Sequence, residues 1–143
     1  MKKYALLMLI VLGMSTAAWA GPWACVDAPA CVCSDECVNI NVGACIPGRF
    51  CGDPYVKWCV KGNLVLVDIY LVRYDECHDS LKLCEPVCLE NLCPGNYSVV
   101  ARIYVKDVGP CAFPGRSVLT AMGSTRFTVK CCDPCCSPWP WWF

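Results

Sequence analysis

The sequence has little of what enzymes and nucleic-acid-binding proteins use. Among 143 residues there is one histidine, His78, and the 12 basic and 12 acidic residues are interspersed without a run of either sign. The absence of a charged patch argues against nucleic acid or an anionic membrane as a partner. One imidazole leaves one candidate general base, and no serine lies in a nucleophile signature. We therefore predict a protein that is not an enzyme and has no cofactor.

The first twenty residues have the three parts of a secretory signal peptide. Lys2 and Lys3 supply positive charge, residues 4–13 are apolar, and Ala18-Trp19-Ala20 matches a small-x-small cleavage site. We predict cleavage after Ala20 and no transmembrane anchor thereafter. The compact lysine-led start resembles bacterial leaders, so the expected destination is the cell surface, the medium or the periplasm.

Sixteen cysteines follow this leader, in about 123 mature residues. Outside the cell, thiols at this density form disulfides, which stabilise small domains. An even number fits complete pairing, but the connectivity stays open. The predicted disulfide residues are Cys25, Cys31, Cys33, Cys37, Cys45, Cys51, Cys59, Cys77, Cys84, Cys88, Cys93, Cys111, Cys131, Cys132, Cys135 and Cys136.

A thiolate metal site is the competing interpretation of these cysteines. The run Cys131-Cys132-Asp133-Pro134-Cys135-Cys136, together with Cys31 and Cys33, has the density to hold zinc or copper(I). Export favours oxidation instead, and adjacent cysteines on a strand point to opposite sides of a sheet. We predict disulfides and no metal site.

The apolar pattern predicts strands and no long amphipathic helix. Apolar and polar residues alternate over residues 38–42. The rest of this cysteine-rich stretch, up to residue 54, is predicted to form loops. Val56, Trp58 and Val60 share a face, and Gly62-Asn63 has the chemistry of a hairpin turn. Residues 64–74 form a long strand that is apolar on both faces, which suits a central strand or one covered by another subunit.

The second half of the chain predicts further strands. Residues 75–96 are rich in cysteine and proline and are expected to form a connection that is cross-linked by disulfides. Over residues 97–105, inward apolar and outward residues alternate regularly. Two more strands, 117–121 and 125–131, are expected to join at 122–124. Short strands without intervening helices predict an all-β, disulfide-rich antiparallel sandwich.

A local motif refines this architecture. Residues 92–99, Leu-Cys-Pro-Gly-Asn-Tyr-Ser-Val, resemble the tyrosine corner of fibronectin type III and related immunoglobulin-like domains. The resemblance covers eight residues and implies that the Tyr97 hydroxyl bonds to upstream backbone, with Trp58 as the comparable buried tryptophan. We predict an immunoglobulin-like sandwich over residues 37–131, after a cysteine-rich entry segment at 21–36 and before a Cys/Trp-rich tail at 132–143.

The tail ends in an apolar cluster. Four aromatic residues, Trp139, Trp141, Trp142 and Phe143, expose more apolar area than a free terminus normally does. The tail either folds back over its own sheet or contacts a neighbouring copy, a carbohydrate or a membrane interface. We take these four residues as the predicted interaction surface.

Two classes of function fit these observations. The first is a secreted structural or adhesive module that self-associates or decorates a cell surface, as a subunit of an assembly or filament. The second is a soluble binding or inhibitory protein that presents stapled loops, such as residues 107–116, to a protein or carbohydrate partner.

Overall fold

Seven β-strands and no helix make up the part of the chain that the structure, a computed structural model, describes. This part comprises residues 21–108 and 115–132, with the backbone alone described at 76–78. The strands are β1 (Trp23–Asp27), β2 (Cys31–Cys33), β3 (Val38–Phe50), β4 (Tyr55–Lys61), β5 (Leu64–Leu89), β6 (Gly95–Asp107) and β7 (Ser117–Lys130). The all-β prediction is confirmed.

The strands form one curled, mixed sheet. Their order is β1-β3-β5-β6-β7-β2, and β4 pairs with β5. The β1–β3, β3–β5, β4–β5 and β6–β7 pairings are antiparallel, whereas β5–β6 and β2–β7 are parallel. The prediction of a wholly antiparallel sheet is therefore wrong for two pairings.

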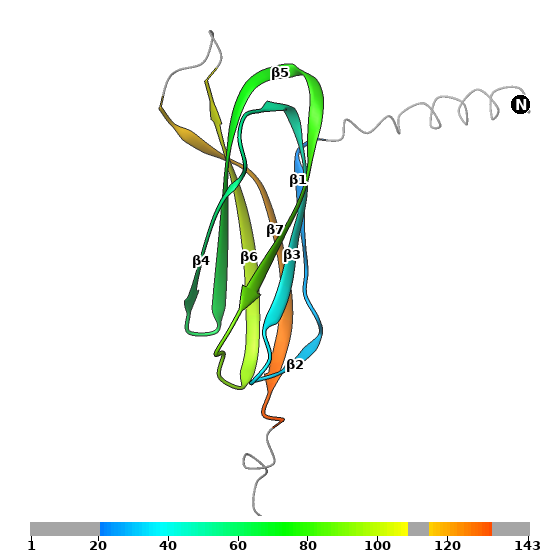
Figure 1. Ribbon diagram of the computed structural model, residues 1–143, viewed down its shortest axis with the longest axis vertical. Coiled ribbons are helices and arrows are strands. Elements are labelled where there is room, and N and C mark those ends of the chain that lie inside the picture. Colours follow the sequence, from blue (N-terminus) through cyan, green and yellow to red (C-terminus); the bar gives the residue numbers. More distant parts are fainter. Residues whose placement is uncertain (1–20, 109–114, 133–143) are drawn as a thin grey trace, which may run out of the picture.

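The strand β5 explains the parallel pairing with β6, because it contributes to two parts of the sheet. Residues 64–73 pair with β6, and residues 80–89 pair with β3. Between them the strand arches over one end of the molecule (Figure 1), and Asp79 adopts a φ of 77° there. Since the second half returns to the starting end, β6 begins beside the start of β5 and runs in the same direction.

The predicted connection over residues 75–96 is wrong as far as Leu89. Leu83, Val87 and Leu89 are buried and alternate with exposed Cys84 and Cys88, so this stretch is a half-buried strand. Cysteine and proline at the outward positions concealed the alternation in the sequence.

Two other strand boundaries differ from the prediction. Residues 117–130 form one strand, because the segment 122–124 stays paired with β6 and only an irregularity opposite Ile103/Tyr104 interrupts the register. Residues 21–54, predicted as loops plus one short strand, contain β1, β2 and a 13-residue β3.

The sheet curls so that β1 packs against β7 without pairing with it. At Gly123 of β7, an added Cβ would lie 2.9 Å from the carbonyl oxygen of Ala24 and 3.1 Å from the Cα of Cys25. Backbone atoms approach this closely only where one residue lacks a side chain. Gly123 therefore permits the contact that closes the core on this side.

The core consists of the inward-facing row of each strand. The predicted alternation is confirmed at residues 38–42 and 97–105, whose inward side chains are at most 6 % exposed. The first half of β5 buries Val65, Val67, Ile69 and Leu71. All buried side chains among the described residues are apolar or tyrosine, so the hydrophobic effect dominates the stability of the fold.

The tyrosine corner forms as its motif implies. The Tyr97 hydroxyl donates a hydrogen bond to the carbonyl oxygen of Cys93 at 2.8 Å, and its ring stacks on Phe127 with centroids 5.3 Å apart. The Gly62-Asn63 hairpin turn between β4 and β5 is also confirmed. The expectation of a buried Trp58 is wrong, since this side chain is 45 % exposed. It lies on the edge strand β4, whose inward face the rest of the curled sheet covers only in part.

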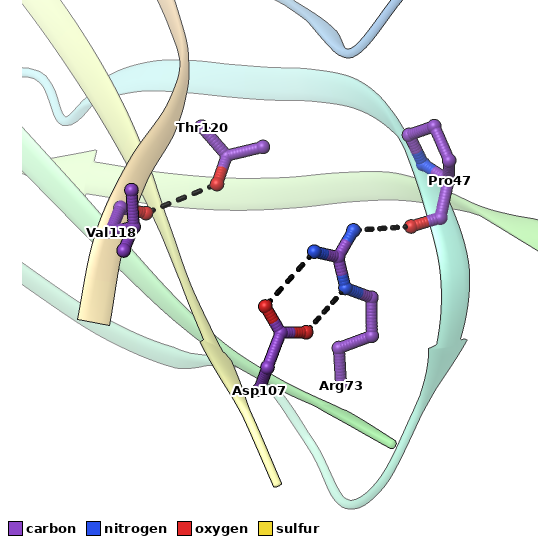
Figure 2. A network of polar contacts seen from close by, with 5 residues as sticks. All are labelled: Pro47, Arg73, Asp107, Val118 and Thr120. Atoms are coloured by element: carbon purple, nitrogen blue, oxygen red, sulfur yellow. Dashed lines mark hydrogen bonds and ion pairs between the residues drawn. The ribbon is translucent and has the colours of Figure 1, made fainter. Parts of the chain in front are cut away.

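Arg73 forms polar contacts that connect three strands at the arched end of the molecule (Figure 2). Its guanidinium donates two hydrogen bonds to the Asp107 carboxylate, at 2.6 and 3.1 Å, and one to the carbonyl oxygen of Pro47 at 3.0 Å. These contacts join the ends of β3 and β6 to the point where β5 begins to bend. The Arg73 and Asp107 side chains are only 15 % and 31 % exposed.

Candidate interaction face

Three tyrosines form a row across the outward surface of β4, β5 and β6. Tyr55 pairs in register with Tyr70, and Tyr70 with Tyr104. The centroids of Tyr55 and Tyr70 are 5.9 Å apart, and Tyr70 and Tyr104 stack at 5.2 Å with 14° between ring planes. The Tyr70–Tyr104 pair is stacked, whereas the Tyr55 ring is tilted by 40° against Tyr70; both arrangements are favourable for aromatic rings. The row is therefore a continuous aromatic surface across three strands.

An ion pair borders the tyrosine row. The Arg102 guanidinium donates two hydrogen bonds to the Asp68 carboxylate, at 2.6 and 2.8 Å, and lies 5.8 Å from the centroid of the Tyr104 ring. The hydrogen bond to Asp68 raises the pKa of Arg102 above its usual value. A raised pKa of a cation preserves its charge as pH increases, so Arg102 stays charged beside the tyrosine row.

Exposed apolar side chains extend the row onto β7. Leu119 pairs with Tyr104 and is 44 % exposed, and Met122 pairs with Arg102 and is 55 % exposed. Tyr55 itself is 65 % exposed. We call these five residues, Tyr55, Tyr70, Tyr104, Leu119 and Met122, the tyrosine face. Clusters of exposed aromatic and apolar groups are typical of surfaces that bind another molecule.

This arrangement was not predicted from the sequence. The apolar outward side of residues 64–74 indicated that something covers it, but the three tyrosines lie far apart in the sequence. Only the parallel register of β5 and β6 brings Tyr70 beside Tyr104. The sequence did contain one signal. Each tyrosine lies at an outward position of its strand, alternating with the inward residues that form the core.

The predicted interaction surface and several predicted disulfide residues lie outside the described part of the chain. Trp139, Trp141, Trp142 and Phe143 lie outside the described residues, as do Cys111, Cys135 and Cys136. The side chains of Cys77 and His78 are likewise outside the described part.

Two disulfides join distant parts of the chain. Cys33 of β2 bonds to Cys132 after β7, and Cys37 bonds to Cys88 of β5. The first closes a separation of 99 residues and the second one of 51 residues. Cys131 is disulfide-bonded as well. Disulfide formation is thus confirmed for these cysteines.

The remaining described cysteines carry free thiols, and their pairing stays a prediction. Cys25, Cys45 and Cys84 lie on the outward side of β1, β3 and β5, where Gly43 separates Cys25 from Cys84 in one register row. The full set of free thiols is Cys25, Cys31, Cys45, Cys51, Cys59, Cys84 and Cys93. In the described part of the chain, no three cysteine, histidine or acidic side chains come close enough to hold a metal ion.

Among the described residues no helix is long and apolar enough to span a membrane. No protein-family model, curated protein or solved structure matches the chain.

Proposed function

We propose that this chain is an exported, non-enzymatic structural or adhesive module that associates with copies of itself through the tyrosine face, as a subunit of an extracellular surface assembly. The observation that carries the proposal is the row of contacting tyrosines, Tyr55, Tyr70 and Tyr104, with exposed apolar side chains beside it.

The energetics of the tyrosine face favour a covered state. An aromatic side chain presents about 150–250 Å² of surface, and covering apolar area contributes about 25 cal/mol per Å². Covering the 65 % of Tyr55 that is exposed would contribute about 3 kcal/mol by this measure. The stacked rings of Tyr70 and Tyr104 also lose little conformational freedom when they are covered, because each is already oriented by the other.

Export and durability support the same proposal. Disulfides persist in oxidising compartments, and Cys33–Cys132 and Cys37–Cys88 both bridge parts of the chain that lie far apart in sequence. The predicted signal peptide gives a route to such a compartment.

An immunoglobulin-like sandwich remains the proposed fold family. The hydrogen bond from Tyr97 to Cys93 and the packing of β1 on β7 across the core support it. The parallel β5–β6 pairing and the exposed Trp58 mark departures from the usual pattern of that family.

Self-association is tested by sedimentation velocity on the alkylated protein, in which free thiols are blocked. We expect concentration-dependent oligomers for the wild type and a shift to monomer for the double variant Tyr55→Ser/Met122→Ser. Trp23→Ser is the matched control, because Trp23 is 50 % exposed but lies on β1, outside the tyrosine face. A wild type that stays monomeric at all concentrations contradicts the proposal.

A soluble binding protein is the second candidate function. The Arg73–Asp107 ion pair fixes Asp107, the first residue of the loop 107–116 that was predicted to contact a partner. A strictly monomeric protein that captures one stoichiometric protein or carbohydrate from the native medium, and loses it on deletion of residues 109–114, would favour this candidate.

A further inference from the structure

The strand β4 has an open edge. Among the described residues it pairs with β5 alone. An edge strand carries a row of backbone amides and carbonyls that can pair with a further segment of chain. The hairpin that joins β4 to β5 identifies which residues of β4 carry this row.

Alternate residues of β4 direct their backbone groups to the open edge. The carbonyl oxygen of Asn63 accepts a hydrogen bond from the amide of Ser98 in β6, so the backbone groups of the next residue, Leu64, face β4. Leu64 is in register with Lys61, which therefore bonds to β5, as do the residues two and four positions before it. The residues between them direct their backbone groups to the open edge: Val60, Trp58 and Val56.

The same three residues form the inward row of β4, and the core covers this row only in part. They lie in register with three fully buried residues of β5, and residues opposite each other share one face of a sheet. Val56 packs against the core, whereas Trp58 and Val60 are 45 % and 37 % exposed. The inward face therefore lacks a cover beside Trp58 and Val60.

The segment that follows Cys132 has the composition to supply this cover. Residues 134–143 carry no charged side chain and include four aromatic residues. In an extended strand, consecutive residues direct their backbone groups to opposite edges, and proline is found where its nitrogen faces away from the neighbouring strand. Pro138 and Pro140 therefore leave only the other edge for pairing, which is the edge of Trp139, Trp141 and Phe143.

Pairing in this phase directs aromatic side chains inward. In an antiparallel ladder, residues that exchange hydrogen bonds lie directly opposite each other and on the same face. Val60 and Trp58 have both their free backbone groups and their exposed inward side chains at the same positions. Aromatic residues that bond to them would therefore cover the exposed part of the inward row.

The end of β7 lies close to the β4–β5 turn. One register row runs across four strands and consists of Lys61, Leu64, Ser98 and Arg126. Lys61 and Arg126 are thus three strand spacings apart, which is about 14 Å along the sheet. Lys130 lies four residues beyond Arg126, or about 13 Å along β7, so it is about 20 Å from Lys61.

The segment 133–143 is long enough to reach the exposed part of β4. Cys132 follows Lys130 by two residues, so it lies at most about 26 Å from Lys61, and Val60 is one residue farther. Nine residues separate Cys132 from Trp141 and span up to about 30 Å when extended. Trp141 can therefore lie opposite Val60.

The start of this segment is fixed on its own copy. The Cys33–Cys132 disulfide holds it at the end of the molecule that carries the β4–β5 turn (Figure 1). A segment tethered there meets its own β4 at a higher effective concentration than the β4 of another copy. This favours pairing within one copy.

We propose that residues 139–143 pair with β4 of the same copy as an added antiparallel edge strand, with Trp141 opposite Val60 and Phe143 opposite Trp58. The added strand covers the exposed inward row. Pro138 and Pro140 leave its outer edge without amides at these positions, which opposes the addition of strands from other copies. This inference goes beyond the proposed self-association, because it closes one edge of the sheet and leaves the tyrosine face for contact.

Amide hydrogen exchange measured by NMR tests the pairing, because it reports the β4 amides directly. The mature chain carries Tyr55→Ser/Met122→Ser, so that association through the tyrosine face does not affect the rates. We expect the amides of Val60 and Trp58 to exchange about tenfold or more slowly than in the same chain without residues 137–143. The amide of Ile103, in the central strand β6, should stay protected in every variant and shows that each is folded.

Two proline substitutions test the phase of the added strand. Trp141→Pro removes an amide that pairs with β4 and should abolish the protection of Val60. Trp142→Pro is the matched control, because its nitrogen faces the outer edge, and protection should remain. Fast exchange of Val60 in the full chain overturns the proposal. So does protection that survives either the deletion or Trp141→Pro, or that is lost in Trp142→Pro.

A mixing experiment separates pairing within one copy from pairing between copies. Isotope-labelled chain without residues 137–143 is mixed with an excess of unlabelled full chain. A labelled Val60 amide that still exchanges fast supports pairing within one copy, whereas protection gained in the mixture overturns it. Sedimentation of the chain with an intact tyrosine face tests the proposed function separately, so the two failures give different results.

Discussion

Replacement of Arg73 by methionine tests whether the arched end of β5 depends on its ion pair. Methionine keeps the apolar length of the side chain but loses both hydrogen bonds to Asp107 and the one to Pro47. A partly exposed ion pair contributes about 1 kcal/mol, and a charged hydrogen bond to a backbone carbonyl in partly buried surroundings contributes about as much. The expected loss in the free energy of unfolding is therefore about 2 kcal/mol.

Lysine at the same position separates charge from geometry. Its ammonium keeps a single contact with Asp107, but it lacks the fork that reaches the carboxylate and Pro47 together. We expect Arg73→Lys to lose about half as much stability as Arg73→Met, or about 1 kcal/mol.

Urea denaturation followed by circular dichroism measures these differences, provided that the slope of free energy against urea concentration stays unchanged. Arg126→Met is the control, since Arg126 is exposed on β7 and should change stability by less than about 0.5 kcal/mol. If Arg73→Met is as stable as this control, the bend does not depend on Arg73. If Arg73→Lys lowers the free energy of unfolding as much as Arg73→Met does, the positive charge alone contributes little to stability.

Three further predictions concern the corner, the closely packed glycine and a disulfide. Tyr97→Phe keeps the stack on Phe127 but removes the hydrogen bond to Cys93, so urea denaturation should show a loss of about 1 kcal/mol; no loss would mean that the bond is not formed in solution. Gly123→Ala forces β1 away from β7 and should cost about 1–3 kcal/mol, whereas Gly21→Ala, with open space around it, should be neutral in the same measurement. Replacing Cys37 and Cys88 by alanine removes a disulfide that closes a separation of 51 residues, so the unfolded chain gains entropy. The free energy of unfolding should fall by about 4 kcal/mol. Thermal or urea unfolding measures this loss, and an unchanged midpoint would contradict it.

Local patterns predicted the parts of the fold that depend on neighbouring residues. The alternation over 97–105 and the turn at Gly62-Asn63 are encoded in a few adjacent positions, and the structure has both. The tyrosine corner was predictable for the same reason, since donor and acceptor are four residues apart.

The parts that failed depend on contacts between distant residues. The second half of β5 looked like a loop because its outward positions hold cysteine and proline, while its inward leucines and valine find their partners in β3. The tyrosine face requires the parallel register between β5 and β6, which follows from the arch and not from any local signal. Trp58 has the apolar spacing of a core residue but lies on an edge strand.

The long pairing of β3 with β5 has a mechanical consequence for this fold. Ten consecutive residue pairs join the two strands, from Val38 with Leu89 to Pro47 with Ser80. Pulling the Phe50 end of β3 and the Leu89 end of β5 in opposite directions would load these antiparallel strands in shear, so that many hydrogen bonds resist together and none opens first. The Cys37–Cys88 bond lies across the same ladder and would stop the strands from sliding past each other.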